Sequence, residues 1–424
     1  MVATRAARGG RSTVALLWGN SQLWGTLMWR GLRALGAPVV VLKSQDIARG
    51  ELQRVAPGAL LAPGGWAKQR SHALGPAGRQ AIQDYLHDGG VYMGFCGGAG
   101  LALQAPAGES LNLCPCDRKP ITERLVNCSG HLELEYTSNH PLCPPMPSST
   151  CMAPVWWPSQ FELLPDSQLT ALAHYRSPGK DFWVADLPYQ DIPREHLAAW
   201  EEHYGITLDP ELLRNEPAVV TGRHGAGHYI LSYVHLETPG SGQANRWLGH
   251  MLSWATGQAL GTHVPEWHPA QAPTQWQDPH LAAFLFALED CLAFGQRHFL
   301  FNSRTPWLLG WRRGLPGFHL STLYGLAHQI RALPPTPKAR RYWQACAAHF
   351  QAQSQRFLER TREYLLLERY AATAHTSHST PIRSACTQAQ AVREELLGPF
   401  PGQSGICGEL TAILENLLYC LIAV

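Results

Sequence analysis

Residues 91–100 read VYMGFCGGAG, and this stretch decides the fold expected for the first half of the chain. The apolar run 91–95 is typical of a strand buried on both faces, and a helical pattern begins directly after Cys96. Glycine on both sides of Cys96 would allow a sharp strand-to-helix turn, the nucleophile elbow that exposes a reactive side chain at a sheet edge. A buried cysteine in a glycine-rich turn remains the alternative.

The residues around this stretch alternate between strand and helix patterns. Strands are expected at 13–18, 38–42 and 58–62, and helices at 23–35 and 77–90. This alternation predicts an α/β fold, a three-layer, doubly wound, mainly parallel sheet of the flavodoxin-like kind, because parallel neighbours need crossover helices.

The remaining sequence indicates one further domain. The α/β domain is expected to span 12–258, with a Cys- and Pro-rich β insertion at about 105–175 and two strands around a glycine-rich turn at 217–237. Residues 259–279 are rich in proline and predict a linker. Residues 280–424 contain only helical patterns and predict an all-α helical domain.

Composition limits the function classes. Of the 424 residues 45% are hydrophobic, and the net charge of +2 shows no excess of basic residues, so we expect no nucleic-acid partner. The 11 cysteines are an odd number at irregular spacing, which favours reduced thiols in a cytoplasmic protein. No apolar stretch approaches the roughly 20 residues of a membrane helix, so we expect no membrane association.

Cofactor and metal motifs are missing from the sequence. It has no G-x-x-x-x-G-K-[ST] phosphate loop to bind a nucleotide, and we expect no cofactor. The cysteines at 114–151, with His131 and His140, include no C-x-x-C pair, so we expect no metal site.

A base for Cys96 is offered by the sequence HLE at 235–237, at the end of an apolar strand. Because side chains alternate along an extended chain, His235 and Glu237 should point the same way. Glu237 could then accept a hydrogen bond from one ring nitrogen of His235 while the other faces the thiol. A chance pair on an exposed strand end is the alternative.

Glycines offer a third component. Gly64 and Gly65 follow the strand at 58–62, where the amide of Gly65 could stabilise an oxyanion together with that of Gly97. Gly64 and Trp66 are expected to bind substrate, although the glycine pair could also form an ordinary tight turn. Walls built by Trp66 and by the tryptophans at 156–157 would favour a substrate flatter or more apolar than glutamine.

These motifs together resemble the class I glutamine amidotransferase fold, and most closely the domain at the amino terminus of eukaryotic biotin–protein ligases. The resemblance covers about residues 12–257 and depends on PGG at 63–65, YLHDGGVYMGFCGGAG at 85–100 and the terminal strand into HLE. The resemblance implies the following roles: a nucleophile, Cys96; a base, His235; a group orienting the base, Glu237; and oxyanion donors, Gly65 and Gly97.

The chain departs from that domain where Trp66 follows the PGG motif, since the ligase-type domain tends to carry an acidic residue or tyrosine there. The helical tail has no GRGR-like biotin-binding loop, so we do not expect a biotin ligase. The expected function is an amidotransferase-like cysteine hydrolase acting on a small amide or related carbonyl substrate. The alternative is a catalytically degenerate module that binds a small molecule or a partner, with the helical domain contacting a protein partner.

Overall fold

The computed structural model describes residues 12–106, 108–137, 140–145, 148–164, 169–310, 317–374, 382–399 and 404–423. The chain divides into two compact units, Met1–Glu266 and Trp267–Val424. The division falls inside the stretch for which the sequence predicts a linker.

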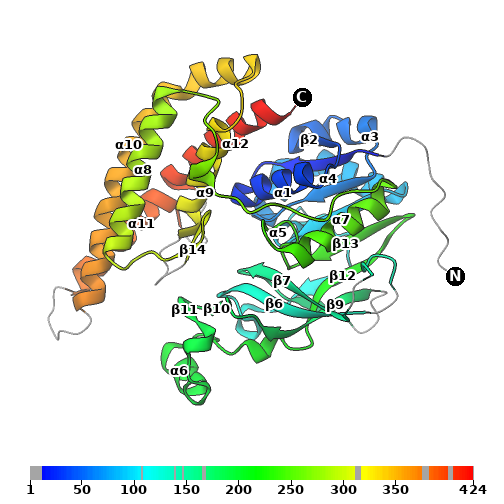
Figure 1. The fold of residues 1–424 in the computed structure, drawn as a ribbon, viewed down its shortest axis with the longest axis horizontal. Coiled ribbons are helices and arrows are strands. Elements are labelled where there is room, and N and C mark those ends of the chain that lie inside the picture. Colours follow the sequence, from blue (N-terminus) through cyan, green and yellow to red (C-terminus); the bar gives the residue numbers. More distant parts are fainter. Residues whose placement is uncertain are drawn as a thin grey trace. The chain divides into compact units, whose positions relative to one another are not determined.

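The first unit is an α/β unit (Figure 1). Its strands are β1 (Val14–Trp18), β2 (Val39–Lys43), β3 (Ala59–Ala62), β4 (Val91–Phe95), β5 (Cys116–Arg118), β6 (Cys128–Tyr136), β7 (Thr150–Trp156), β8 (Phe161–Leu163), β9 (Thr170–Pro178), β10 (Trp183–Val184), β11 (Leu187–Pro188), β12 (Pro217–His224) and β13 (Gly227–Ser232). Its helices are α1 (Gln22–Ala34), α2 (Ser44–Ala48), α3 (Glu51–Val55), α4 (Ala67–His87), α5 (Gly97–Gly100), α6 (Leu197–Tyr204) and α7 (Gly242–Thr256).

The main sheet has a parallel half and an antiparallel half. Strands β2, β1, β3, β4 and β13 follow one another in parallel, and β12, β9, β6, β10 and β11 continue the sheet in antiparallel pairs. The predicted doubly wound α/β fold is therefore confirmed, and its parallel half carries the carboxyl ends of β3, β4 and β13 at one edge. Open sheets of this kind build their sites at that edge.

The core explains why the central strands are continuous apolar runs. All five residues of β1 and all five of β4 are buried. Ala15, Leu17 and Leu60 join one cluster with Leu52 of α3 and Ile82 of α4, on one face of the sheet. Strands with helices on both faces have no polar side, which is the physical reason for their lack of alternation.

The Cys- and Pro-rich insertion enlarges the sheet. Strands β6 and β7 form an antiparallel hairpin, and β9 joins β6 to β12. Strands β5 and β8 pair separately as a small ribbon. Strands β12 and β13 form the predicted hairpin around the glycine-rich turn, with Arg223 opposite His228.

Two helices differ from the prediction. Helix α4 begins at Ala67, ten residues before the predicted start at 77, and continues across a non-helical Gly75 with a φ of 62°. The Gly75-Pro76 pair, a common stop signal, hid the first half of this helix from the sequence pattern. Helix α5 has only four residues, so the helix that was expected to follow Cys96 ends at Gly100.

The second unit contains α8 (Pro279–Arg297), α9 (Gly317–Arg331), α10 (Pro337–Ala374), α11 (Ile382–Leu397) and α12 (Gly405–Ile422), and the long helices α8 and α10 lie side by side (Figure 1). It also has a short hairpin of β14 (Ser303–Thr305) and β15 (Leu308–Leu309), so the prediction of an all-α unit was wrong in this detail. The pattern missed the hairpin because strands of two or three residues are too short to show a period.

Helix α12 is long and apolar enough to cross a membrane by length and composition, and it is the one such helix found in the described residues. In this structure 56% of its apolar window is buried, and it packs against α9, α10 and α11. This finding differs from the sequence-based expectation that no apolar stretch approaches the length of a membrane helix.

The two units generate the first prediction. A chain ending at residue 266 should unfold cooperatively by itself, because the α/β unit has its own buried core. Thermal unfolding followed by circular dichroism would measure this, with the full chain as the reference. An insoluble product, or a melt without a cooperative transition, would mean that the α/β unit depends on residues after 266.

Candidate active site

Cys96 ends β4 in a strained conformation. Its φ is 48° and its ψ is −108°, values that a residue with a side chain rarely adopts. The backbone nitrogen of Cys96 donates to the carbonyl oxygen of Ser232 on β13 at 2.7 Å, and its side chain is partly exposed. This is the geometry of a nucleophile elbow.

The glycines after Cys96 are required by a close backbone approach. A Cβ atom at Gly97 would overlap the carbonyl of Gly65, and one at Gly98 would overlap the carbonyl of Ala62. The turn after β3 therefore lies directly against the turn after β4. Gly65 has a φ of 121°, which also favours glycine.

This approach brings the expected oxyanion donors together. The backbone nitrogen of Gly65 is 3.0 Å from the point that a Cβ at Gly97 would occupy. Gly97 is the first residue of α5, so its amide has no partner within the helix. Both amides lie beside Cys96, although α5 is too short to contribute a large helix dipole.

His235 and Glu237 form a buried pair. Nδ1 of His235 and Oε1 of Glu237 are 2.8 Å apart, and both side chains are 0% exposed. The pair does not lie on a strand, as the sequence analysis expected. Strand β13 ends at Ser232, and a turn in which Thr238 N donates to His235 O at 3.2 Å brings the side chains together.

The electrostatics of His235 link it to the thiol. Burial lowers its pKa, but the charge of Glu237 and hydrogen bonding to Cys96 and Glu237 outweigh burial and raise the pKa to about 10. Among the described atoms, Nε2 has no hydrogen-bond partner of normal geometry. The thiol is therefore near enough to influence the ring without being aligned with it, as is common in catalytic sites without substrate.

Strand β7 of the insertion holds the histidine turn. His235 N donates to Pro154 O at 2.8 Å, and Trp156 Nε1 donates to Thr238 Oγ1 at 3.2 Å. Trp156 is only 3% exposed, so it packs in the interior. On α1, the Trp24 ring lies 4.4 Å from that of His235.

Arg70 is a positioning residue that the sequence analysis missed. It is 0% exposed on α4. Its guanidinium donates to Pro63 O (2.7 Å), Gly64 O (3.0 Å), Asn20 O (3.2 Å) and Ser21 Oγ (3.1 Å). A buried charge is tolerated only when it is well hydrogen-bonded, and here it joins the turns after β1 and β3. Arg70 and Leu74 lie on the same buried face of α4. A helix predicted from residue 67 would have placed Arg70 on this apolar face and so indicated that it is buried.

The two residues expected to bind substrate lie differently. Gly64 is buried, and a Cβ at this position would meet the Trp24 ring at 2.7 Å, so this glycine faces the interior. Trp66 is partly exposed and precedes α4, and its buried Nε1 has no hydrogen-bond partner among the described atoms.

Within the described ranges, no group of three or more His, Cys, Asp or Glu side chains could hold a metal ion. The ten cysteines that the structure describes are free thiols.

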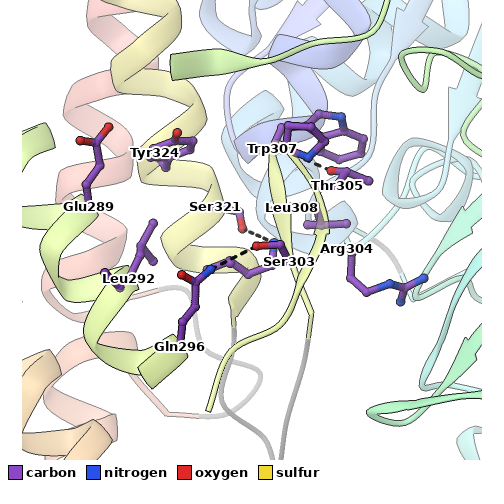
Figure 2. Close-up of a pocket in the computed structure, with 13 residues that line it drawn as sticks. Glu289, Leu292, Gln296, Ser303, Arg304, Thr305, Trp307, Leu308, Ser321 and Tyr324 are labelled. Atoms are coloured by element: carbon purple, nitrogen blue, oxygen red, sulfur yellow. Dashed lines mark hydrogen bonds between the residues drawn. The ribbon is translucent and has the colours of Figure 1, made fainter. Parts of the chain in front are cut away.

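The helical unit has a separate cavity of about 520 Å³ (Figure 2). Glu289, Arg304 and Tyr324 line it, and its Ser321 hydroxyl accepts a hydrogen bond from Leu309 N at 2.9 Å. The residues that line it include no cysteine or histidine. The cavity therefore lacks the nucleophile and base found at Cys96.

No protein-family profile and no curated protein matches the chain. Solved structures are similar to part of it. A GMP synthase subunit from Thermoplasma acidophilum has 12% identity over 58% of this chain and 96% of its own, with a TM-score of 0.36. A glutamine amidotransferase from Thermotoga maritima has 12% identity over 56% and 81%, with a TM-score of 0.33. A β-galactosidase from Bacillus circulans sp. alkalophilus has 9% identity over 61% and 32%, with a TM-score of 0.36. Similarity at this level concerns the course of the backbone and assigns no activity.

The close approach after β4 generates a stability prediction. Gly98→Ala should lower the free energy of unfolding by about 1–3 kcal/mol, because its methyl group would overlap the carbonyl of Ala62. Gly242→Ala is the matched control, since no atom lies within 4 Å of its Cβ position. Denaturant unfolding of both variants would measure the difference, and equal stability would contradict the packing described here.

The His235–Glu237 pair generates a pH prediction. The folded pKa of His235, about 10, lies above its ordinary value of 6.5, so its contribution to stability is complete below pH 6.5 and is lost as the pH rises through 10. Glu237→Gln removes the charge that raises the pKa and should flatten this decline. Melting temperatures across this pH range would measure it, with Asp88→Asn, an exposed acid beside His87, as the control. Parallel profiles for the wild type and Glu237→Gln would refute the coupling.

Proposed function

We propose that this protein is an amidotransferase-like cysteine hydrolase acting on an amide or related carbonyl substrate. The observation that carries the proposal is the strained, partly exposed Cys96 beside the buried His235–Glu237 pair. Cys96 and the His235–Glu237 pair follow the ends of two neighbouring parallel strands, β4 and β13. The sequence resemblance to the amino-terminal domain of biotin–protein ligases supports the same assignment.

The first half of the reaction forms a thioester. The sulfur of Cys96 attacks the carbonyl carbon, and the carbonyl electrons move to the oxygen, which the amides of Gly65 and Gly97 stabilise. The raised pKa of His235 favours a resting state in which the ring already carries the proton. When the C–N bond breaks, His235 donates this proton to the leaving amine.

The second half restores the thiolate and the protonated ring. His235, now neutral, takes a proton from water while the water oxygen attacks the thioester carbon. The C–S bond breaks, the sulfur leaves as the thiolate, the ring keeps the proton, and a carboxylic acid is released. Glu237 accepts the Nδ1 hydrogen bond throughout and keeps Nε2 free for these transfers.

The second candidate function is a degenerate binding module in the cytoplasm, with the helical unit contacting a protein partner. The observation that favours it is the missing hydrogen bond at Nε2, since an active pair needs the ring and thiol aligned. The cavity of the helical unit would then be the binding site (Figure 2).

The proposal predicts how variants hydrolyse a simple activated ester such as p-nitrophenyl acetate. Cys96→Ala and His235→Ala should each lower kcat/KM by about 10⁴-fold or more, because they remove the nucleophile and the proton carrier. Glu237→Gln should lower kcat/KM less than either of these changes, because Glu237 orients the ring without reacting. Cys346→Ala, a partly exposed cysteine of the helical unit, is the control.

Glutamine should be a poor substrate of the isolated chain, because ammonia is useful only beside an acceptor domain and the sequence has no phosphate loop. Rapid glutamine hydrolysis would contradict this point. Ester hydrolysis that survives Cys96→Ala would contradict the mechanism.

A further inference from the structure

Polar side chains of the insertion gather next to Cys96. Ser232 pairs with Phe95 across β13 and β4, so Tyr233 and Cys96 leave the sheet side by side. The Phe161 ring on β8 lies 4.3 Å from the Tyr233 ring. The β5–β8 ribbon is therefore anchored at the end of β13.

Arg118 extends from this ribbon over the nucleophile turn. It pairs with Phe161 in the register of β5 and β8. Its Nη2 lies against Gly100, so close that a Cβ atom at that position would overlap it. Gly100 N in turn donates a hydrogen bond to Cys96 O at 3.0 Å. The guanidinium thus lies one helical turn from the nucleophile.

Arg124 adds a second positive charge. Its Nη1 donates to Ser159 Oγ at 2.5 Å, while its buried Nε has no hydrogen-bond partner among the described atoms. Burial lowers the pKa of Arg124, and so does the nearby charge of Arg118, whereas Tyr233 opposes this. The two guanidinium groups are close enough to repel each other.

Within the described part of the chain, neither Arg118 nor Arg124 forms an ion pair. The neighbouring Lys119 forms one with Glu216, at 2.7 Å. Arg118 is exposed to water, so the repulsion between the two charges is felt mainly at the partly buried Arg124. An anion bound by both arginines would relieve this repulsion.

Buried hydroxyl groups point to the same conclusion. Tyr233 and Tyr175 are each 1% exposed, and neither hydroxyl has a hydrogen-bond partner of normal geometry among the described atoms. Burial raises the pKa of both hydroxyl groups, and for Tyr233 it outweighs the charge of Arg118 and the interactions with Ser159 and Arg118, which lower the pKa, so both remain protonated donors. Of the two, Tyr233 is the one that lies beside both arginines, and an unpaired buried donor there is typical of a site that awaits an acceptor.

We propose that Arg118 and Arg124, with the Tyr233 hydroxyl, bind a carboxylate or phosphate group of the substrate beside Cys96. The substrate class is then an amide or ester with a net negative charge near the scissile carbonyl. Glutamine carries an ammonium group as well as a carboxylate, so its net charge of zero gives it less attraction to two cations than an anionic substrate has. An anionic substrate also replaces the apolar one that the tryptophans suggested from the sequence. The substrate part depends on the proposed hydrolase, whereas the anion site depends only on the geometry.

The test compares two alkylating reagents at Cys96, anionic iodoacetate and neutral iodoacetamide. Each forms one S–CH₂ bond and releases iodide, so they differ mainly in charge. Peptide mass spectrometry gives the rate at Cys96 for each reagent, and the labelling ratio is the iodoacetate rate divided by the iodoacetamide rate. This ratio should fall roughly tenfold in Arg118→Gln and in Arg124→Gln, because each change removes a cation that attracts iodoacetate. Arg118→Lys should keep most of the ratio, and Arg54→Gln, an exposed arginine paired with Glu51, should leave it unchanged.

Two protectants distinguish the source of the anion. Inorganic phosphate or succinate should slow iodoacetamide labelling of Cys96 in the wild type, and each should slow it less in the two arginine variants. Stronger protection by phosphate would identify a phosphate site, and stronger protection by succinate a carboxylate site. A ratio that is equal in all variants, or a Cys96 that reacts with neither reagent, would overturn the proposal.

Hydrolysis separates this proposal from the hydrolase itself. Mono-p-nitrophenyl succinate should be preferred over p-nitrophenyl acetate in the wild type, and the preference should disappear in Arg118→Gln. A retained labelling ratio without any Cys96-dependent hydrolysis would support the anion site and count against the hydrolase. Cys96-dependent hydrolysis without a preference for the charged ester would support the hydrolase and count against the anion site.

Discussion

The whole site depends on the close contact between the turn after β3 and the turn after β4. Only glycine at 97 and 98 permits this contact, because any Cβ would overlap a carbonyl of the neighbouring turn. Arg70 holds the turn after β3 by donating hydrogen bonds to the carbonyl oxygens of Pro63 and Gly64. The strained φ of Cys96 and the adjacent amides of Gly65 and Gly97 follow from this contact. Strain of this kind persists only where the surroundings fix it.

The insertion after the elbow completes what the central sheet begins. Its strand β7 holds the backbone of His235 through Pro154, and its ribbon brings Arg118 over the turn. The site therefore combines a rigid parallel half, which presents the nucleophile, with an antiparallel half that supports the base and adds positive charge. Burial makes the charge of His235 expensive and the paired Glu237 compensates it, whereas Arg118 is exposed to water.

Local patterns were sufficient for some features and insufficient for others. The apolar run before Cys96 and the glycines after it predict the strand and the elbow, because both depend on neighbours in sequence. The HLE sequence predicts the His235–Glu237 contact, although a turn makes it in place of a strand. Arg70 was missed because the helix prediction stopped at Gly75, and Arg118 because the β5–β8 pairing joins residues that are far apart in the sequence. Such pairing leaves no local period to detect.

The most direct test of the central claim is a competition among the cysteines of the folded protein for limiting iodoacetamide near neutral pH. Peptide mass spectrometry would give the relative rate at each of the 11 cysteines. The account predicts that Cys96 reacts first and by a wide margin, and that His235→Ala removes this advantage, because the strained turn exposes the thiol beside its base. Labelling spread evenly over the exposed cysteines, or an advantage that survives His235→Ala, would contradict it.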